Sequence, residues 1–265
     1  MPRAKSYPGK VVKNRRMGNR RMHWVRSYFK SGQKYGIYSD AMDVFVKVLA
    51  KRIRNHQQNV VVVEGNTGAG KSTLAIQLCY ELAKQLKVPF SLEQDYIYSL
   101  ADLYRKIEDP QASPINLIDE AVLIVNAKRS QTKESVDTVN LFNTMRSLGW
   151  TTIMCAPSIF QIDKTVRVVH VDYKVHCSSE DSCPLPGYGR GFFEVSKARR
   201  HEYSKSAEPY WVLQCTGVFG SLPPAIDAEY QPIKKAAQMR LIAGMAKRHG
   251  YENDENNGDK NDGTQ

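Results

Sequence analysis

The fold is decided by Gly65-Asn66-Thr67-Gly68-Ala69-Gly70-Lys71-Ser72, which matches the phosphate-binding pattern G-x-x-x-x-G-K-[ST] at every fixed position. A β-branched run at residues 60–63 precedes this stretch, and residues 74–83 follow it with apolar side chains at helical spacing. A strand, a glycine-rich loop and a helix in this order form a site for anions. Glycines let the backbone wrap a phosphate, and the helix N-terminus supplies partial positive charge.

Each part of this glycine loop has an expected role. Lys71 is expected to reach the β- and γ-phosphates of a nucleoside triphosphate, and the Ser72 hydroxyl is expected to be a ligand for Mg²⁺. The residues predicted to contact the nucleotide are Gly65, Asn66, Thr67, Gly68, Ala69, Gly70, Lys71, Ser72 and Thr73. No signature for the base is present, so ATP is the default ligand, together with Mg²⁺, and GTP stays open.

Two acids, Asp119 and Glu120, end an apolar run at residues 115–118. In open α/β sheets, ligands bind at the carboxyl ends of the strands. We expect Asp119 to hold the Mg²⁺ shell through water and Glu120 to polarise the attacking water. A Glu beside the Asp favours hydrolysis over phosphoryl transfer to a small substrate, so the pair predicts an Mg²⁺-dependent ATPase. The alternative is that both acids simply end a strand.

Strands and helices alternate along most of the chain. Helices are expected at residues 39–55, from the loop to 87, and at 99–107, 135–147 and 232–248. Strands are expected at residues 60–63, 96–98, 115–118, 150–156, 166–175, 192–195 and 210–219. This order predicts an α/β fold of the P-loop NTPase type, with a mostly parallel sheet sandwiched by helices. Late strands with short connections predict antiparallel strands added at the C-terminal side.

The formal net charge of +11 is unevenly distributed, because residues 1–39 contain eleven Lys or Arg and no acid, whereas residues 251–265 contain five acids and one Lys. This distribution predicts four parts. They are a basic N-terminal arm at 1–38, the ATPase domain at 39–225, a basic C-terminal helix at 226–250 and a disordered acidic tail at 251–265.

The composition of the chain predicts where in the cell the protein is located. No stretch approaches the roughly 18 apolar residues of a transmembrane helix, and no apolar segment follows the basic N-terminus, so neither a membrane span nor a secretory signal is expected. The five scattered cysteines favour reduced thiols in the cytoplasm, which for a viral protein means the host cytoplasm or the virion. A zinc site at His176, Cys177 and Cys183, with His170 nearby, is the alternative, but the Cys177–Cys183 spacing is not a standard pair and no second pair follows, which favours structural thiols.

Residues 145–158 carry a narrower signal, since they join a helix bearing Arg146 to an apolar strand followed by Ser158. With the preceding Asp-Glu strand, this order resembles the FtsK/HerA superfamily of DNA-pumping ATPases, over about residues 58–175 of this chain. The family usually ends this strand in Thr-Gln, whereas here it ends in Ala156-Pro157-Ser158. Ser158 and Gln161 are therefore both candidates for the polar sensor of the γ-phosphate.

The resemblance also implies a ring-shaped homo-oligomer, in which one subunit donates an arginine to the γ-phosphate of its neighbour. Arg146 is the first candidate for this arginine finger and Arg167 the second. The alternative for Arg146, weighed equally, is a solvent-facing or salt-bridging residue. For Arg167 the favoured alternative is a side chain on the exposed face of a Val-rich strand.

The basic segments indicate a polyanionic partner. Positive charge with interleaved aromatic residues in the N-terminal arm suits a nucleic-acid backbone, through counterion release and stacking. Further basic side chains lie in the loop at 126–134 and in the C-terminal helix, namely Lys128, Arg129, Lys133, Lys234, Lys235, Arg240, Lys247 and Arg248. Solvated surface charge, a membrane surface and a localisation signal are the alternatives; one sign of charge over the whole arm favours nucleic acid, DNA more than RNA.

The sequence therefore predicts an ATP-hydrolysing motor that translocates or packages DNA, of viral or mobile-element type. Two other functions stay open. One is a zonular-occludens-toxin-like phage assembly ATPase, although such proteins normally need a membrane span. The other is an ATP-switched replication or helicase-loading factor, for which Asn or Gln at position 120 would have been expected in place of Glu120.

Overall fold

The computed structural model describes residues 12–17, 20–26, 34–38, 41–109, 111–125, 133–179, 191–200 and 208–248. The chain divides into two units, Met1–Leu222 and Pro223–Gln265, which are described separately.

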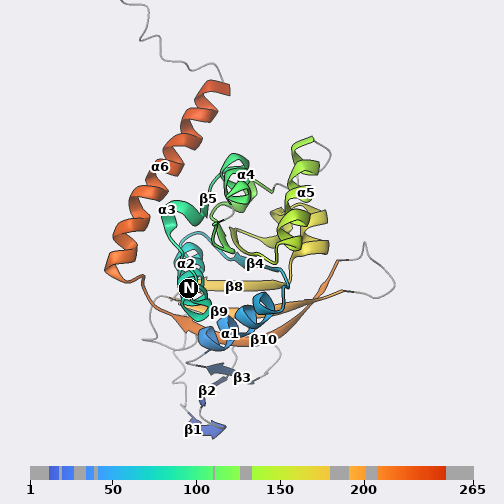
Figure 1. Cartoon of the computed structure of the whole chain (residues 1–265). Helices are drawn as coiled ribbons and strands as arrows, with labels where there is room; N and C mark the ends of the chain where they lie inside the picture. The colour runs from blue at the N-terminus through green and yellow to red at the C-terminus, as the bar shows by residue number, and fades with distance from the viewer. Residues whose placement is uncertain are drawn as a thin grey trace, which may run out of the picture. The chain divides into compact units, whose positions relative to one another are not determined.

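Among the described residues, the first unit is built on a ten-stranded sheet (Figure 1). Its strands are β1 (Val12–Met17), β2 (Arg20–Arg26), β3 (Lys34–Tyr38), β4 (Asn59–Glu64), β5 (Tyr96–Ile97), β6 (Ile115–Ile118), β7 (Thr151–Ala156), β8 (Tyr173–Ser179), β9 (Gly191–Arg199) and β10 (Tyr210–Phe219). They are ordered β1-β2-β3-β10-β9-β8-β4-β7-β6-β5 across the sheet.

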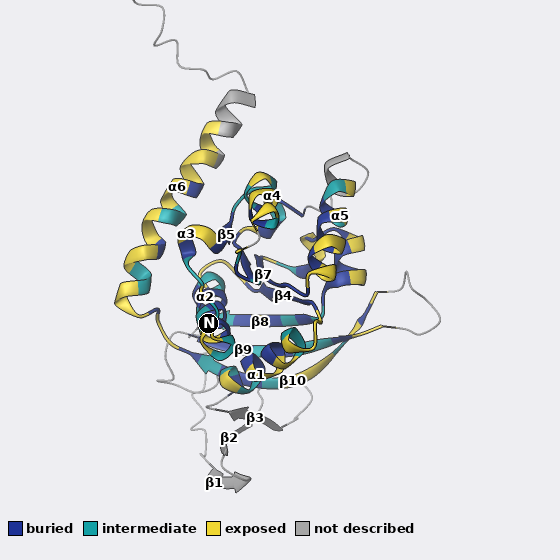
Figure 2. Ribbon diagram, in the orientation of Figure 1, coloured by how far each residue is buried: buried dark blue, intermediate teal, exposed yellow. Residues whose placement is uncertain are grey.

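The centre of the sheet is parallel. Strands β5, β6, β7, β4 and β8 are parallel neighbours, whereas β9 is antiparallel to both β8 and β10. This arrangement confirms the predicted α/β fold, including the antiparallel strands at the C-terminal side. Strands β4, β6 and β7 are buried along their length, as Figure 2 shows for β4, which is expected of parallel strands covered on both faces.

Helices cover both faces of this sheet. They are α1 (Ala41–Arg54), α2 (Lys71–Leu86), α3 (Leu92–Asp95), α4 (Leu100–Glu108) and α5 (Lys133–Ser147), with short helical turns η1 (Ala121–Leu123), η3 (Ile159–Gln161) and η4 (Val166–His170). Phe142 of α5 belongs to one buried cluster with Val60 and Val62. Because side chains alternate along a strand, Val61 and Val63 face the opposite side. Helix α2, which contacts β4, β6 and β7, covers that side.

Local signals explain why the helices begin and end where they do. Ser99 and Asp102 form a capping box at the start of α4, so the helix begins where the sequence predicts. Lys87 directly follows α2, and its left-handed backbone (φ 60°) lets its N–H cap the last turn of the helix.

A buried ion pair joins α4 to the residues before β5. Lys106 of α4 lies 2.6 Å from Asp95 and also donates a hydrogen bond to the carbonyl of Ile115 at the start of β6.

One predicted element is wrong in part. The Val-rich run at residues 166–175 was expected to be a strand, but residues Val166–His170 form the helical turn η4 and the strand begins only at Tyr173. Asp163 starts the turn, because its carboxylate accepts a hydrogen bond of 2.8 Å from the backbone N–H of Thr165. Val166 and Val171 are buried in the same cluster as Phe142 of α5 rather than in a ladder, and Val169 is exposed, so the β-propensity of this run misleads.

Residues 1–38, the predicted basic arm, contain three strands. Strands β1 and β2 are antiparallel neighbours, and so are β2 and β3. Strand β3 joins the sheet by parallel pairing with β10, where Ile37 lies opposite Thr216. Part of this arm therefore extends the sheet.

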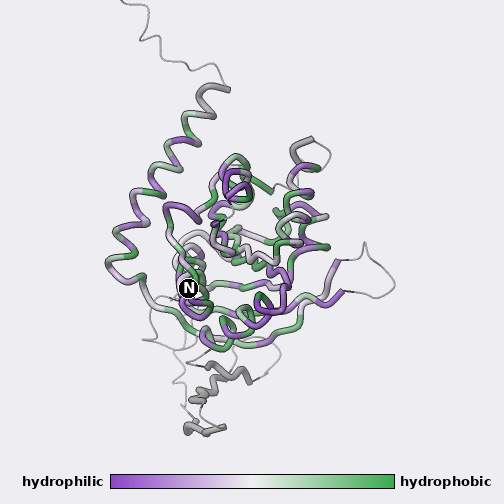
Figure 3. Tube along the Cα trace, in the orientation of Figure 1, coloured by the Kyte–Doolittle hydropathy of each residue, from purple (hydrophilic) through white to green (hydrophobic). Residues whose placement is uncertain are grey.

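The second unit contains the helix α6 (Pro224–Arg248), which begins earlier than the predicted residue 232. A proline suits the first turn of a helix, because its missing N–H would have had no intrahelical partner. Hydrophilic and hydrophobic residues are interspersed along α6, as Figure 3 shows. None of the described helices combines the length and apolar content needed to cross a membrane. The predicted acidic tail lies outside the described residues.

Candidate nucleotide site

Parallel pairing brings the ends of three strands to one edge of the sheet. Glu64 at the end of β4 lies opposite Ala156 of β7, and Ile118 at the end of β6 lies opposite Met154. Strand β7 lies between β4 and β6. The glycine loop, the segment after β7 and the Asp119-Glu120 pair therefore meet at this carboxyl edge, as the sequence predicts for a ligand site.

The glycine loop depends on glycine at two positions. Gly70, the residue before α2, has a left-handed backbone with φ 87°, which a side chain would disfavour. A Cβ at Gly65 would lie 2.2 Å from the carbonyl oxygen of Cys177, so strand β8 leaves no room for one. The Lys71 ammonium lies over the loop and donates to the carbonyl oxygens of Gly65 and Asn66, both at 2.9 Å. Lys71 is thus placed at the centre of the glycine loop.

Ser72 and Asp119 lie side by side. The Ser72 hydroxyl donates to Asp119 Oδ1 at 2.9 Å. The hydroxyl of Tyr96, on the neighbouring strand β5, donates to Asp119 Oδ2 at 3.2 Å. Sequence reasoning missed Tyr96; it predicted a short strand at 96–98, but only the pairing of β5 with β6 brings this residue beside Asp119. Tyr96 and Ser72 therefore bond to different oxygens of the Asp119 carboxylate.

Glu120 has an unusual backbone. It is exposed and has φ 58° and ψ 49°, which puts a non-glycine residue in the left-handed region. This conformation turns the chain directly after Asp119 and lets the backbone N–H of Leu123 bond to the Glu120 carbonyl at 2.9 Å. Burial, then the charges of Glu120 and Asp119, raise the pKa of Tyr98. Tyr98 is therefore close to both acids, and sequence reasoning missed it too.

The segment after β7 is tied to the root of the glycine loop. Ser158 caps the turn η3, because its hydroxyl accepts a hydrogen bond from the Phe160 backbone N–H at 3.3 Å. The next residue, Ile159, donates its backbone N–H to the Glu64 carboxylate at 2.8 Å. Glu64 directly precedes Gly65. It thus links the residue after Ser158 to the start of the loop, a role that the sequence did not reveal.

Strand β8 places two basic side chains beside the same carboxylate. Lys174 Nζ and His176 Nδ1 each lie 3.5 Å from Glu64 Oε1. Burial raises the pKa of Glu64, but the hydrogen bonds from His176 and Ile159 and the charge of Lys174 outweigh it and lower the pKa overall. The hydrogen bond with Glu64 in turn raises the pKa of His176. The carboxylate is therefore held in its charged form.

Cys177 of β8 contacts the glycine loop. Its thiol donates to the Ala69 carbonyl oxygen at 2.8 Å, and burial raises its pKa to about 12, so it stays a thiol. Cys183, the other cysteine of the zinc alternative, lies outside the described residues. Over the part of the chain that the structure describes, no group of three His, Cys, Asp or Glu is placed to hold a metal ion.

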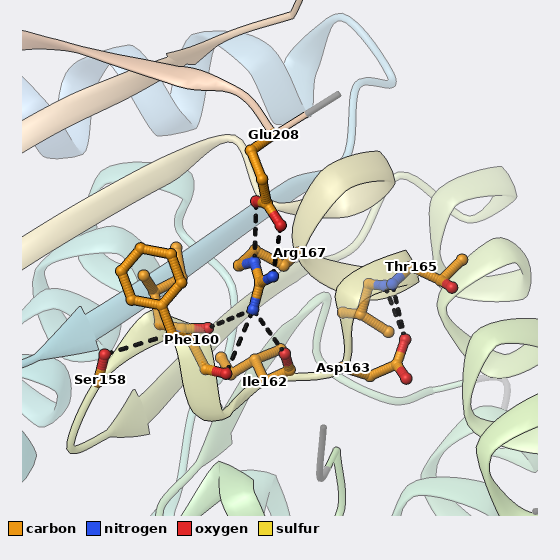
Figure 4. A network of polar contacts seen from close by, with 9 residues as sticks. Ser158, Phe160, Ile162, Asp163, Thr165, Arg167 and Glu208 are labelled. Atoms are coloured by element: carbon orange, nitrogen blue, oxygen red, sulfur yellow. Dashed lines mark hydrogen bonds and ion pairs between the residues drawn. The ribbon is translucent and has the colours of Figure 1, made fainter. Parts of the chain in front are cut away.

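Arg167 does not have the geometry of an arginine finger. Its guanidinium is bonded within the chain at every nitrogen, to both Glu208 carboxylate oxygens and to the carbonyls of Ile159, Phe160 and Ile162 (Figure 4). The side chain is only 10% exposed, whereas a finger must extend from the surface to reach another subunit. Arg167 instead holds the segment that follows Ser158, and the expected exposed position on a strand face is wrong as well.

Arg146 lies at the other edge of the sheet. It is exposed near the end of α5, which leads into the start of β7, and the strand carries the chain back to the carboxyl edge. Within one chain, the structure therefore does not bring Arg146 to the glycine loop. Arg146 does lie near His170, a buried imidazole that packs against Phe142 with ring centroids 5.7 Å apart. Residues 126–132, most of the predicted basic loop, lie outside the described residues.

His170 predicts a pH-dependent stability. Burial, assisted by the charges of Arg146 and Arg200, lowers its pKa from 6.5 to about 4. Between these values the unfolded chain takes up a proton that the folded chain does not, so stability falls as the pH falls. We expect His170 to cost about 2 kcal/mol of unfolding free energy between about pH 7.5 and about pH 5. Urea unfolding of wild type and His170→Leu at both pH values measures this, and equal losses in the two proteins would contradict it.

The architecture is the α/β fold of P-loop NTPases. A family model described as nSTAND3, Novel STAND NTPase 3, matches residues 46–155. No curated protein matches the chain. The chain is similar to the N-terminal domain of zonular occludens toxin from Neisseria meningitidis, with 16% identity, covering 66% of this chain and 100% of that chain, at a TM-score of 0.40.

The chain is also similar to the genome packaging NTPase B204 from Sulfolobus turreted icosahedral virus 2 in complex with ATP-gammaS. That similarity has 15% identity, covers 62% of this chain and 98% of that chain, and has a TM-score of 0.37. Membership of the FtsK/HerA superfamily stays a prediction from the sequence motifs.

Proposed function

We propose that this protein is an Mg²⁺-dependent ATPase that works as a ring-shaped oligomer and moves or packages DNA. The observation that carries the proposal is the hydrogen bond of 2.9 Å between Ser72 Oγ and Asp119 Oδ1. It joins the end of the glycine loop to the end of β6, the pairing that metal-assisted phosphate chemistry requires. Glu120 follows directly, exposed at the same edge.

The donor atoms fit Mg²⁺. This ion prefers oxygen ligands and keeps several of its waters, and the site offers a hydroxyl and a carboxylate 2.9 Å apart. Ser72 would bind the ion directly, and Asp119, held by Tyr96, would bind it through water. When bound, the ion neutralises negative charge on the β- and γ-phosphates.

Three residues of the chain have separate proposed roles in ATP hydrolysis. Lys71 binds the phosphate oxygens from the centre of the loop. Glu120 accepts a proton from the attacking water as the water oxygen bonds to the γ-phosphorus. The bond between that phosphorus and the bridging oxygen breaks, which gives ADP and phosphate. Ser158, positioned through Ile159 and Glu64, is the proposed sensor of the γ-phosphate.

Arg146 supports an oligomeric enzyme. It is exposed and lies at the edge of the sheet opposite its own glycine loop, so it is suited to a nucleotide bound by another subunit. We retain Arg146 as the proposed arginine finger. DNA as the partner is supported by the charge of +11 and by its concentration in residues 1–39.

The test of the proposed function is steady-state ATP hydrolysis by the full chain. Activity is measured with and without double-stranded DNA, single-stranded DNA and RNA, over a series of salt concentrations. Stimulation by DNA that falls steeply with salt supports the motor. Hydrolysis that no polymer changes would contradict it and would favour the ATP-switched or assembly alternatives, in which a protein partner activates the enzyme.

Lys71→Ala tests the nucleotide site itself. We expect the variant to lose ATP binding, by about 10²-fold or more, because each charged hydrogen bond to phosphate contributes about 1.5–3 kcal/mol. Lys84→Ala is the matched control, since Lys84 lies on the same helix with its side chain 80% exposed. A fluorescent ATP analogue measures the affinities. Equal affinities in the two variants would remove Lys71 from the site.

A further inference from the structure

We propose that Arg167, together with Glu208, is a positioning residue for ATP hydrolysis, which acts within its own subunit by setting the position of Ser158. This inference rests on the proposed function, because Ser158 is the proposed sensor of the γ-phosphate. Two observations carry it: the charged groups that hold the residue after Ser158, and the way in which one guanidinium bonds to a whole turn.

Ile159, the residue after Ser158, has both of its backbone polar groups bonded to charged side chains. Its N–H donates to the Glu64 carboxylate at 2.8 Å, and its carbonyl oxygen accepts from Arg167 Nη1 at 3.5 Å. Glu64 ends β4 and Arg167 lies in η4, so two separate elements hold this residue. The Ile159 side chain is 1% exposed and belongs to the buried cluster. The chain directly after Ser158 is therefore fixed on all sides.

The Arg167 guanidinium also holds the rest of this turn. Nη1 donates to the carbonyl oxygens of Phe160 at 3.3 Å and Ile162 at 3.1 Å, while Nε and Nη2 donate to the two carboxylate oxygens of Glu208 (Figure 4). Arginine carries five N–H donors in a planar fork, whereas lysine carries three on a single nitrogen. A lysine at this position could not bond to three carbonyls and a carboxylate in the same directions. The shape of the turn thus depends on an arginine.

The same turn orients the Ser158 hydroxyl. Phe160 donates its backbone N–H to Ser158 Oγ at 3.3 Å, and the carbonyl of Phe160 is one of the groups that Arg167 holds. A hydroxyl that accepts one hydrogen bond keeps its own hydrogen to donate, as the proposed contact with the γ-phosphate requires. Arg167 is therefore connected to the reaction through Phe160 and Ser158, without reaching the nucleotide itself.

The first experiment measures kcat for ATP hydrolysis and the affinity for a fluorescent ATP analogue on the same preparations of the full chain. We expect Arg167→Lys to lower kcat by about tenfold or more, because a misplacement of about 1 Å can cost about 10²-fold. Its affinity for ATP should stay close to that of wild type, since the hydrogen bonds of the guanidinium lie outside the glycine loop. In a Ser158→Ala background, Arg167→Lys should lower kcat no further, because a positioning residue acts through the residue that it positions.

Glu208→Gln is the second variant, because it leaves every buried residue of the turn unchanged. The Glu208 side chain is 44% exposed, whereas that of Arg167 is 10% exposed. Glu208→Gln should lower kcat in the same direction as Arg167→Lys but by less, since glutamine can still accept one hydrogen bond from the guanidinium. If Arg167→Lys lost ATP affinity through misfolding, Glu208→Gln alone and in the Ser158→Ala background would give the same test.

Mixed oligomers distinguish a role within the subunit from that of an arginine finger. Arg167→Lys and Arg146→Ala are each mixed with Glu120→Gln, which carries both arginines and is expected to bind ATP without hydrolysing it. Arg146→Ala should regain hydrolysis, because a Glu120→Gln neighbour supplies the missing finger. Arg167→Lys should not, because its own turn stays unchanged by the neighbour.

The outcomes separate this inference from the proposed function. Recovery of Arg167→Lys on mixing, losses that multiply in the double variant with Ser158→Ala, or wild-type kcat in Arg167→Lys would each overturn the positioning role and leave the ATPase standing. Failure of Arg146→Ala to recover would contradict only the proposed finger, and the double variant would still decide the role of Arg167. Wild-type kcat in Ser158→Ala would overturn both the sensor and the positioning role. A wild-type chain that hydrolyses no ATP would overturn the proposed function as well.

Discussion

Glu120→Gln is expected to lower kcat for ATP hydrolysis by about 10²–10⁴-fold, the usual contribution of a general base. Glutamine keeps the size of the side chain and can still hydrogen-bond to water, but it cannot accept a proton. The affinity for ATP should stay close to that of wild type, because Glu120 is not part of the loop that surrounds the phosphates. Single-turnover hydrolysis and an ATP-binding titration on the same preparation separate the two effects.

The control for this variant is Glu108→Gln, which removes an exposed carboxylate from α4. It should hydrolyse ATP at the wild-type rate. If Glu120→Gln also retained near wild-type hydrolysis, the assignment of the proton acceptor would be wrong. In that case the pair of residues that ends β6 would contribute only Asp119 to the reaction.

Lys106→Ala is expected to lower the free energy of unfolding by about 3–5 kcal/mol, the cost of leaving a buried charge without its partner. Lys106 and Asp95 are 5% and 4% exposed, and the ammonium also bonds to the carbonyl of Ile115. Burial lowers the pKa of Lys106, and Asp95 opposes this effect. Urea unfolding at neutral pH measures the loss, which should also weaken the start of the strand that carries Asp119.

An exposed ion pair of nearly the same length provides the comparison. Lys47 and Asp43 on α1 are 2.7 Å apart, but their side chains are 59% and 57% exposed. Lys47→Ala should cost only about 0.5 kcal/mol. Replacing both buried partners, in Asp95→Asn/Lys106→Met, should recover much of the stability lost in Lys106→Ala, because no charge is then left unpaired. Equal effects of Lys106→Ala and Lys47→Ala would contradict this account.

The sequence predicted those parts of the molecule that depend on local pattern. The glycine loop follows from a fixed spacing, the strand β4 from a β-branched run, and the start of α4 from Ser99 as a helix cap. The proximity of Ser72 and Asp119 could also be predicted, because the carboxyl ends of parallel strands lie at one edge. In each case the chemistry of a few neighbouring residues determines the outcome.

The remaining features depend on residues that are distant in the chain. The role of Glu64 could not be predicted, because its partners Ile159 and His176 lie about a hundred positions away and nothing in the sequence connects them. Arg167 was expected on an exposed strand face, but Glu208 and three backbone carbonyls hold it in a turn. Tertiary contacts of this kind override local propensity, and no spacing rule indicates them.

The left-handed backbone at Glu120 has a consequence for how this chain can vary. A residue with a Cβ costs about 1–2 kcal/mol in this conformation, whereas glycine adopts it readily and asparagine at less cost. Selection for thermal stability alone would therefore favour Gly or Asn at this position and would discard the carboxylate. A Glu here is a residue that folding does not favour, and such departures from the most stable choice are concentrated at functional sites.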